Sequence, residues 1–303
     1  TRLQGDWSSD VCSSDLGSIL RAAVGEFMLR RTKASHLTGL PQKRIYSGDQ
    51  TDSAYEYMAS LAGVMKGPQL VHYDDIIGSV RSAAVGDRSQ LVLPSLLRLK
   101  ITSIHQDIEA KHALPTSGKE MLKQAEQSIK LAALINILRD IEKRGEKAII
   151  FATTKSVQAY VCALVTSIFS VPVAIINGDT KAVPSKLDSQ TRKVIIDKFQ
   201  DGAGFGVIIM SPVAAGVGLT IVEANNVIHL ERHWNPAKEA QATDRVYRIG
   251  QKRDVNVYLP MALHPSTKSF DLKLNGLLVN KIDLSDAVVA PSIVDSQDLE
   301  SCF

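Results

Sequence analysis

Hydrophobic and polar positions follow two different patterns along the chain, and the change falls near Gly145. Residues 17–40 have the pattern of a helix that runs into a basic stretch and ends at Pro41. From about residue 50 to 145, apolar residues recur every three or four positions, which is typical of amphipathic helices. The clearest helix is predicted within residues 128–147, with Gly145 as its C-terminal stop and one apolar face formed by Leu131, Leu134, Ile135, Leu138 and Ile141.

Short apolar runs rich in β-branched residues take over after this point. They occupy residues 147–153, 171–178, 205–211, 226–230 and 254–260. Amphipathic segments through about Ser167 and over residues 191–200 separate the first three runs. Short strands that alternate with helices predict a parallel sheet covered by helices on both faces. We therefore expect a compact α/β domain over residues 116–275, preceded by a helical region, and a frayed polar end at residues 292–303.

Composition narrows the class of protein only slightly. The chain has 303 residues, of which 45% are hydrophobic, so it has room for two globular domains. Its net charge of +3 is too small to indicate a polyanionic partner, and a nucleic-acid face would have to be a local patch. Cys12, Cys162 and Cys302 stand far apart, which argues against a zinc site or a disulfide framework and favours a cytoplasmic location. The sequence has no secretion signal and no apolar run of membrane-spanning length, so we expect no membrane contact.

The first candidate for chemistry is a small-residue loop after the predicted strand that ends at Ser211. Gly216 and Gly218 in this loop allow the backbone to come close to a ligand or to adopt a positive φ. Ligands of open α/β sheets bind at the carboxyl ends of strands, where such a loop lies. A tight connection between a strand and a helix needs the same glycines, so both interpretations stay open.

The second candidate is a helix predicted from Asn235 to about Ile249. Asn235 followed by Pro236 is a favourable helix start, and Gly250 is a C-terminal stop. On such a helix Gln241, Arg245 and Arg248 share one narrow face, at i, i+4 and i+7.

Two guanidinium groups on one helix face would repel each other unless an anion lay opposite them. A phosphate group suits this arrangement, because arginine offers two parallel donors and stays charged. The alternative is a solvated charged face that includes Glu239 and Asp244.

Three motifs in this region carry a family resemblance. They read AAGVGLT at 214–220, HLERHWNP at 229–236 and QATDRVYRIGQ at 241–251. In order and spacing they resemble the C-terminal helicase lobe of Swi/Snf-type superfamily-two ATPases. Weaker similarity extends over about residues 20–260, for example FMLRRTK at 27–33 and INGDT at 176–180. DEAD-box RNA helicases are less similar, because their RIGRTGR-like run is absent.

The resemblance implies a RecA-like fold and a role for each motif. Arg245 and Arg248 would reach the ATP γ-phosphate across the interface between two lobes and stabilise transition-state charge, with Gln241 holding that face in register. Gly216 and Gly218, together with Asp244, would couple the nucleotide state to DNA. These roles follow from the family and not from the spacing.

The same resemblance implies a duplex DNA partner. Thr153, Lys155, Gly178 and Thr180 lie in loops that would touch the phosphate backbone through salt-sensitive contacts that ignore base sequence. Val213 stands where the family often has a basic residue, which puts a DNA contact from that loop in doubt. Ala215 replaces a glycine and Thr220 an asparagine. For residues 259–281 we expect only a bracing role.

Two histidines, His229 and His233, lie close together in the sequence. With no third ligand nearby, we expect no metal site there.

The chain has no G-x-x-x-x-G-K-[ST] motif and no acidic quartet of the DEAH kind. In this family both belong to the first RecA-like lobe, which would hold most of the contacts to ATP and Mg²⁺. We expect residues 17–115 to hold the end of that first lobe and a helical linker, and residues 276–303 to form a brace and tail. Alone, the chain should be inactive as an ATPase.

The opening residues call for a separate explanation. Residues 6–16, DWSSDVCSSDL, can be encoded by a sequencing-library adapter read through as codons. We therefore expect residues 1–16 to be a disordered artefact, the alternative being a flexible Ser/Asp cap. Two functions remain for the whole: the motor lobe of a DNA-dependent ATPase, or a non-catalytic DNA-binding or scaffold protein that retains this lobe.

Overall fold

The structure is a computed structural model that describes residues 39–51, 53–112, 115, 117–181, 191–215 and 219–287. The expectations for residues 1–16, for the helix at 17–38, for Gly216 and Gly218 and for residues 292–303 lie outside these ranges. None of the described helices combines the length and the apolar content needed to cross a bilayer.

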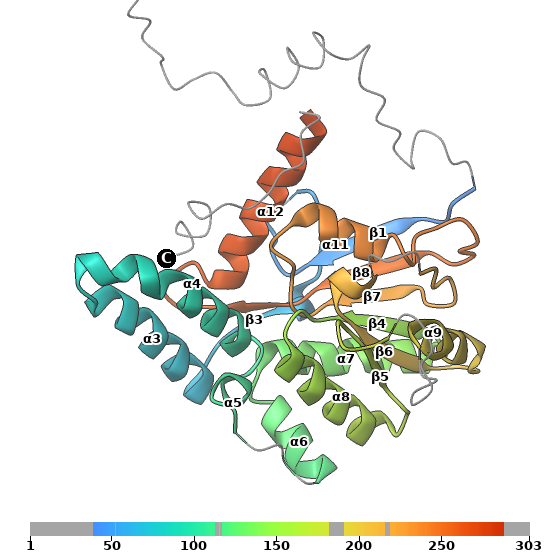
Figure 1. The fold of residues 1–303 in the computed structure, drawn as a ribbon, viewed down its shortest axis with the longest axis horizontal. Helices are drawn as coiled ribbons and strands as arrows, with labels where there is room; N and C mark the ends of the chain where they lie inside the picture. Colours follow the sequence, from blue (N-terminus) through green and yellow to red (C-terminus); the bar gives the residue numbers. More distant parts are fainter. Residues whose placement is uncertain are drawn as a thin grey trace, which may run out of the picture.

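A parallel sheet of seven strands forms the centre of the molecule, in the order β2-β1-β8-β7-β4-β6-β5 (Figure 1). Five of these strands confirm the runs predicted from the sequence: β4 (Lys147–Phe151), β5 (Ala174–Ile176), β6 (Gly206–Met210), β7 (Asn226–His229) and β8 (Val255–Leu259). The central strand β4 is buried along its whole length between β6 and β7. This parallel sheet is what the alternating pattern predicts, and it fits the RecA-like fold that the family resemblance implies.

The far edge of the sheet is formed by two strands within residues 43–57 that were not predicted from the sequence. β1 (Lys43–Ser47) pairs with β8 over five residues, and β2 (Glu56–Tyr57) pairs with β1. A separate two-stranded sheet joins β3 (Ala62–Val64) to β9 (Met261–Leu263). The expectation of helix throughout residues 50–145 is therefore wrong for residues 56–64. Such short strands carry little local periodicity and depend on their partners: β2 on β1, and β3 on β9, which lies about 200 residues later in the chain.

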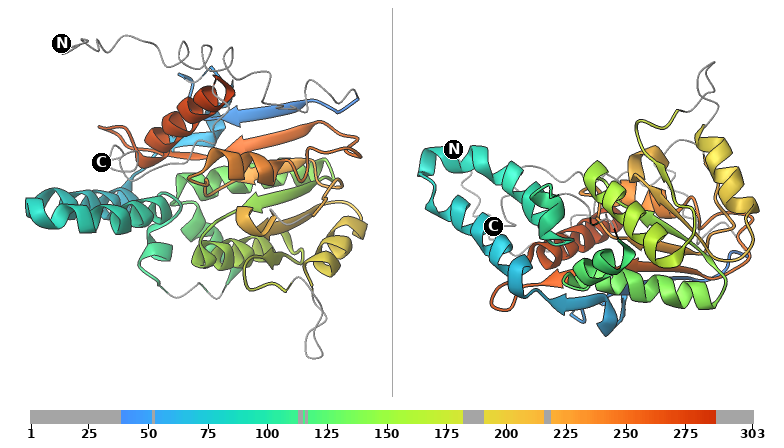
Figure 2. Two further views of the ribbon diagram at one scale, coloured as in Figure 1. Left: turned by 45° about the horizontal axis from the view of Figure 1, so that its top comes forward. Right: turned by 90° about the horizontal axis from the view of Figure 1, so that it is seen from below.

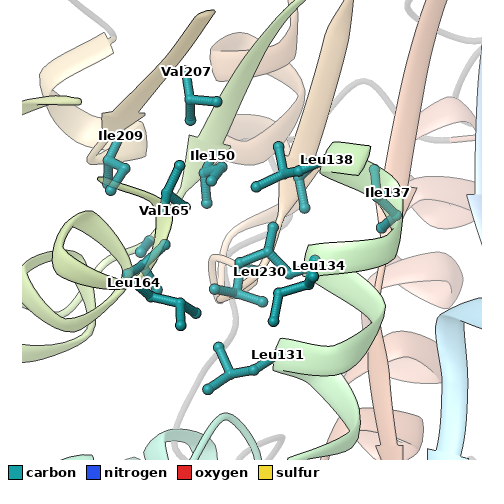
Figure 3. Packing of buried hydrophobic residues seen from close by; sticks show 14 of the residues in the cluster. Leu131, Leu134, Ile137, Leu138, Ile150, Leu164, Val165, Val207, Ile209 and Leu230 are labelled. Atoms are coloured by element: carbon teal, nitrogen blue, oxygen red, sulfur yellow. The ribbon is translucent and has the colours of Figure 1, made fainter. Parts of the chain in front are cut away.

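Helices cover both faces of the sheet. α7 (Ile129–Lys143) and α8 (Lys155–Phe169) pack with Ile150, Val207 and Ile209 in one core, shown in Figure 3. α9 (Arg192–Asp201), the short α10 (Pro212–Ala215) and α11 (Pro236–Thr243) lie on the other face, where their apolar residues join Ile149 and Ile208. The alternation of Ile149 and Ile150 between two cores is the period of a strand buried on both sides.

α7 confirms the clearest helix prediction. Ser128 caps its start by accepting a hydrogen bond from the Leu131 amide at 3.3 Å. Gly145 lies just after its end with a φ of +63°, a conformation that favours glycine. The five predicted core residues of this helix, Leu131, Leu134, Ile135, Leu138 and Ile141, are all buried.

The remaining helices lie outside the sheet layers. α3 (Gly67–Ser82) and α4 (Val85–Thr102) form a hairpin that extends away from the sheet (Figures 1 and 2). A third core joins this hairpin to α12 (Phe270–Ala287) through residues such as Tyr73, Leu99 and Phe270. The short helix η2 (Ala59–Leu61) lies between β2 and β3, and the short helices α5 (Gln106–Glu109) and α6 (Gly118–Ala125) connect the hairpin to α7.

Candidate nucleic-acid and nucleotide site

The loops that follow β4, β5 and β7 all emerge at the carboxyl ends of the strands, on the same side of the sheet, because all its strands are parallel. The four residues predicted to touch DNA lie here: Thr153, Gly178 and Thr180 in the loops after β4 and β5, and Lys155 as the first residue of α8. Binding sites of open α/β sheets lie at this carboxyl edge.

Glu231, just after β7, organises the loop after β4. Its carboxylate accepts hydrogen bonds from the backbone amides of Thr153 at 2.7 Å and Thr154 at 2.8 Å, and from both threonine hydroxyls. Burial alone would raise the pKa of Glu231, but the Lys100 ammonium and the threonine donors lower it below its usual value. The Thr153 hydroxyl is thus directed into the protein. Any DNA contact at this position has to use other atoms of the loop.

The loop after β5 is fixed by its own side chains. The Asn177 side-chain oxygen accepts a hydrogen bond from the Asp179 backbone amide at 2.9 Å, and the Asn177 backbone amide donates to the Thr180 hydroxyl oxygen at 3.1 Å. The Arg192 guanidinium donates to the carbonyl of Thr180 at 2.9 Å. A Cβ added at Gly178 would meet no atom within 4 Å, so the backbone there faces open space. This is compatible with close approach by a ligand backbone.

An ion pair joins these two loops at the surface. Lys155 Nζ lies 2.7 Å from an Asp179 carboxylate oxygen, and the two side chains are 67% and 70% exposed. Such exposed pairs are worth little energy. The Lys155 ammonium can therefore exchange its carboxylate partner for a phosphate at small cost.

The helix predicted from Asn235 to about Ile249 begins at the predicted residue but ends earlier. Asn235 caps α11 by accepting from the amides of Ala237 at 2.9 Å and Lys238 at 3.3 Å. The helix stops at Thr243, and residues 244–250 form successive turns that end at Gly250 with a φ of +102°. The expected helix to Ile249 is therefore wrong. The sequence after Thr243 closes shorter-range bonds, such as Arg245 amide to Ala242 carbonyl at 3.2 Å.

Because α11 ends early, the side chains of Gln241, Arg245 and Arg248 do not lie on one helix. Only Gln241 lies on α11, where it is exposed, whereas Arg245 and Arg248 lie in the turns. Arg248 is exposed, Arg245 is half-buried, and Asp244 is the half-buried C-cap. The shared helical face predicted by i, i+4 and i+7 spacing does not form as such.

The turns are nevertheless held against residues 221–224. The Arg245 carbonyl accepts a hydrogen bond from the Ile221 amide at 3.0 Å. The Gln251 side chain donates to the Ala224 carbonyl at 2.7 Å, also within this segment. The turns within the 241–251 motif are thus bonded to residues that closely follow the 214–220 motif.

The two histidines of this region have structural partners. His229 is buried, stacks on Phe151 with ring centroids 5.1 Å apart, and lies 2.8 Å from the Thr243 hydroxyl through Nε2. Burial lowers its pKa to about 4. His233 Nδ1 accepts the Asn235 amide at 2.9 Å. Within the described ranges no group of three or more His, Cys, Asp or Glu side chains is placed to hold a metal ion.

Two charged residues that were not predicted from the sequence, Glu231 and Arg232, hold the elements of this region together. Glu231 fixes the start of α8, and Arg232 binds Glu239 of α11 through Nη2–Oε1 at 2.6 Å and Asn275 of α12. Both follow a buried strand and stand inside the HLERHWNP motif. Charged residues at the end of a fully buried strand are the signal that could have identified them.

Comparison with protein families supports the motif assignment. Residues 129–250 match the helicase conserved C-terminal domain family. The chain is 34% identical over 93% of its length to the Zorya protein ZorD of Escherichia coli O139:H28, and covers 25% of that protein. It is 30% identical over 94% of its length to YwqA of Bacillus subtilis, a candidate ATP-dependent helicase/translocase, and covers 28% of it. The chain thus spans about a quarter of the length of these relatives.

Solved structures show the same fold. The Sulfolobus solfataricus SWI2/SNF2 ATPase core in complex with dsDNA is 25% identical with a TM-score of 0.57, and the similarity covers 88% of this chain and 50% of that one. The C-terminal part of the Fun30 ATPase domain has a TM-score of 0.63 at 20% identity, with 87% of this chain and 97% of that chain covered. The second similarity concerns the fold alone.

Proposed function

The chain contains a C-terminal lobe of the superfamily-two Snf2 type, and from this premise we propose that it is the C-terminal motor lobe of an ATP-dependent DNA translocase. The observation that carries the proposal is the junction of two loops at one sheet edge. Loops 152–155 and 177–181 meet there through the exposed Lys155–Asp179 pair. A cation on two exposed, backbone-rich loops suits the phosphate backbone of a duplex, which is recognised without regard to base sequence.

DNA binding would follow from exchange of partners at this pair. The Lys155 ammonium leaves Asp179 for a phosphate, and the open space at Gly178 admits the DNA backbone. The start of α8, immediately after Thr154, contributes the positive end of its dipole. Because these contacts are electrostatic, the affinity should fall steeply as the salt concentration rises.

For ATP, we infer one role for the residues of this chain, which is a contact to the γ-phosphate. Arg248, which is exposed, and Arg245, which is half-buried, lie in the turns after α11, and their guanidinium groups suit a contact to the γ-phosphate of a nucleotide held on the first lobe. Mg²⁺ would neutralise phosphate charge when it is bound, and its ligands would come from that first lobe. The chain itself has neither a phosphate loop nor a magnesium carboxylate motif.

Steady-state ATP hydrolysis tests this function. The chain alone should give no turnover. Joined to the first lobe encoded in its native gene, it should hydrolyse ATP, and duplex DNA should stimulate the rate. Joined protein that binds DNA without hydrolysing ATP would overturn the motor assignment in favour of a DNA-binding or scaffold role.

A further inference from the structure

A buried lysine connects the α3–α4 hairpin to the loop after β4. Lys100 lies near the end of α4, and its side chain is 3% exposed. Its ammonium is 3.2 Å from Glu231 Oε1 and donates to the Thr153 hydroxyl at 3.0 Å. It also lies 5.2 Å from the centroid of the Trp234 ring. These partners come from two separate segments, both at the carboxyl edge of the sheet.

Glu231 binds the two residues immediately before α8, Thr153 and Thr154. Thr154 stands at the N-cap, but its own side chain makes no capping hydrogen bond. The Glu231 carboxylate instead accepts the amides of Thr153 and Thr154. With both hydroxyls added, this one carboxylate receives four hydrogen bonds from the loop. Its position therefore sets the direction in which the next residue, Lys155, leaves the sheet.

A carboxylate that is 0% exposed is costly unless a cation compensates it. Lys100 is that cation. Without it, Glu231 would tend to take up a proton or move toward water, and either change weakens the hydrogen bonds that it accepts from the two threonine amides. The order of loop 152–155 thus depends on a side chain that is more than fifty residues away in the sequence and belongs to a helix outside the sheet.

We propose that Lys100 is a positioning residue for DNA binding, which holds Glu231 so that Thr153 and Thr154 aim Lys155 at the phosphate backbone. The inference deepens the proposed function and rests on it. Lys100 itself touches no DNA, because it is buried under Trp234 and Glu231. Through Lys100, the α3–α4 hairpin thereby contacts loop 152–155 in addition to the hydrophobic core.

Lys100→Met tests this in the chain of 303 residues, with Lys130→Met as a matched control. Lys130 is also buried, with a side chain 2% exposed, and forms an ion pair with Asp271 of α12 at 3.2 Å. Both variants lose a buried ion pair, so we expect both to lower the melting temperature by similar amounts. Only Lys100→Met should loosen the loop. Lys100→Arg keeps the positive charge and a cation–π contact to Trp234, and should restore much of the wild-type behaviour.

Two readouts separate positioning from stability. Amide hydrogen exchange at Thr153 and Thr154 should become at least about tenfold faster in Lys100→Met and stay unchanged in Lys130→Met. Fluorescence anisotropy with a labelled 30-base-pair duplex should show an affinity about threefold to thirtyfold weaker for Lys100→Met alone. Both results together would support the proposal.

The contrary outcomes are distinct. Unchanged exchange at Thr153 and Thr154 would overturn the positioning role, whatever the DNA affinity. Faster exchange with unchanged DNA affinity would show that the loop order does not serve DNA binding. Equal loss of affinity in the Lys130→Met control would reduce Lys100 to a structural residue. Wild-type chain that binds no duplex DNA would overturn DNA recognition by this lobe, and with it both proposals.

Discussion

Arg232 and Glu239 form a buried, two-pronged ion pair: Arg232 Nη2 lies 2.6 Å from Glu239 Oε1, and Nε lies 3.2 Å from Oε2. Glu239 also accepts the His233 amide at 3.1 Å. The pair attaches α11, the helix that leads to Arg245, to the end of β7. Burial opposes ionisation of Glu239, but Arg232 outweighs it and lowers the pKa to about 2.

Breaking this pair should destabilise the lobe strongly. Glu239→Gln leaves the Arg232 guanidinium buried without its counter-charge, and we expect a loss of about 3–5 kcal/mol in the free energy of unfolding. Urea unfolding followed by circular dichroism measures it. Glu142→Gln, an exposed glutamate on α7, is the control and should change stability by less than about 0.5 kcal/mol. A loss no larger than that of the control would show that the pair contributes no net stability.

His229 should give the lobe a characteristic acid sensitivity. Its folded pKa of about 4 lies below the ordinary 6.5, so the unfolded state binds the proton more readily. Stability is therefore complete above pH 6.5, falls as the pH drops toward 4, and levels off below that, by up to about 3 kcal/mol. Glu239, Arg232 and His233 face this ring. Glu239 remains ionised over the window, since its pKa is about 2.

Urea unfolding between pH 7.5 and 4 measures this dependence. His229→Gln keeps a donor for Thr243 without a titrating ring, so its stability should fall less over the same range. If the slope is the same in both proteins, other groups carry the acid sensitivity.

Lys155 should supply one phosphate contact. Lys155→Gln should weaken duplex binding at low salt and reduce the slope of log affinity against log salt by about 1. Asp179→Asn should strengthen binding, because it releases the ammonium from its carboxylate. Lys143→Gln is the control, since Lys143 forms a similarly exposed pair with Asp140 at 3.2 Å on α7. Anisotropy titrations at several salt concentrations measure all four proteins, and equal slopes for Lys155→Gln and wild type would contradict the contact.

Arg245 and Arg248 should act on turnover more than on nucleotide binding. In the lobe joined to its native first lobe, Arg248→Ala should lower DNA-stimulated ATP turnover by roughly a thousandfold, the scale of an arginine finger. Arg245→Ala should behave similarly, while ATP affinity changes far less, because the contact strengthens in the transition state. Arg253→Ala is the control and should be nearly silent. Arg253 lies beyond the turns and donates to the Glu223 carbonyl at 2.6 Å.

Steady-state rates with saturating DNA decide among these variants. Near-wild-type turnover in both Arg245→Ala and Arg248→Ala would remove the phosphate role from the turns. A large loss in Arg253→Ala as well would indicate a general disturbance of this surface.

The amino-acid sequence by itself determined the central layer of this lobe. Five strands and the helices between them follow from local patterns, because a strand buried on both faces must be a continuous apolar run and a covering helix must show an apolar stripe. Caps are equally local: Ser128 and Asn235 both bond amides within three residues. The motifs from 214 to 251 were sufficient to predict the lobe type.

Only the tertiary structure decided the features that depend on distant partners. β1 exists because β8 offers it a ladder, from Lys43 opposite Val255 to Ser47 opposite Leu259. α11 ends at Thr243 although its sequence continues a helical pattern, and the turns instead reach Ile221. Lys100 and Glu231 come together across 131 positions. Local patterns report which face of an element is apolar, but a buried charge is tolerated only where the whole fold places its counter-charge.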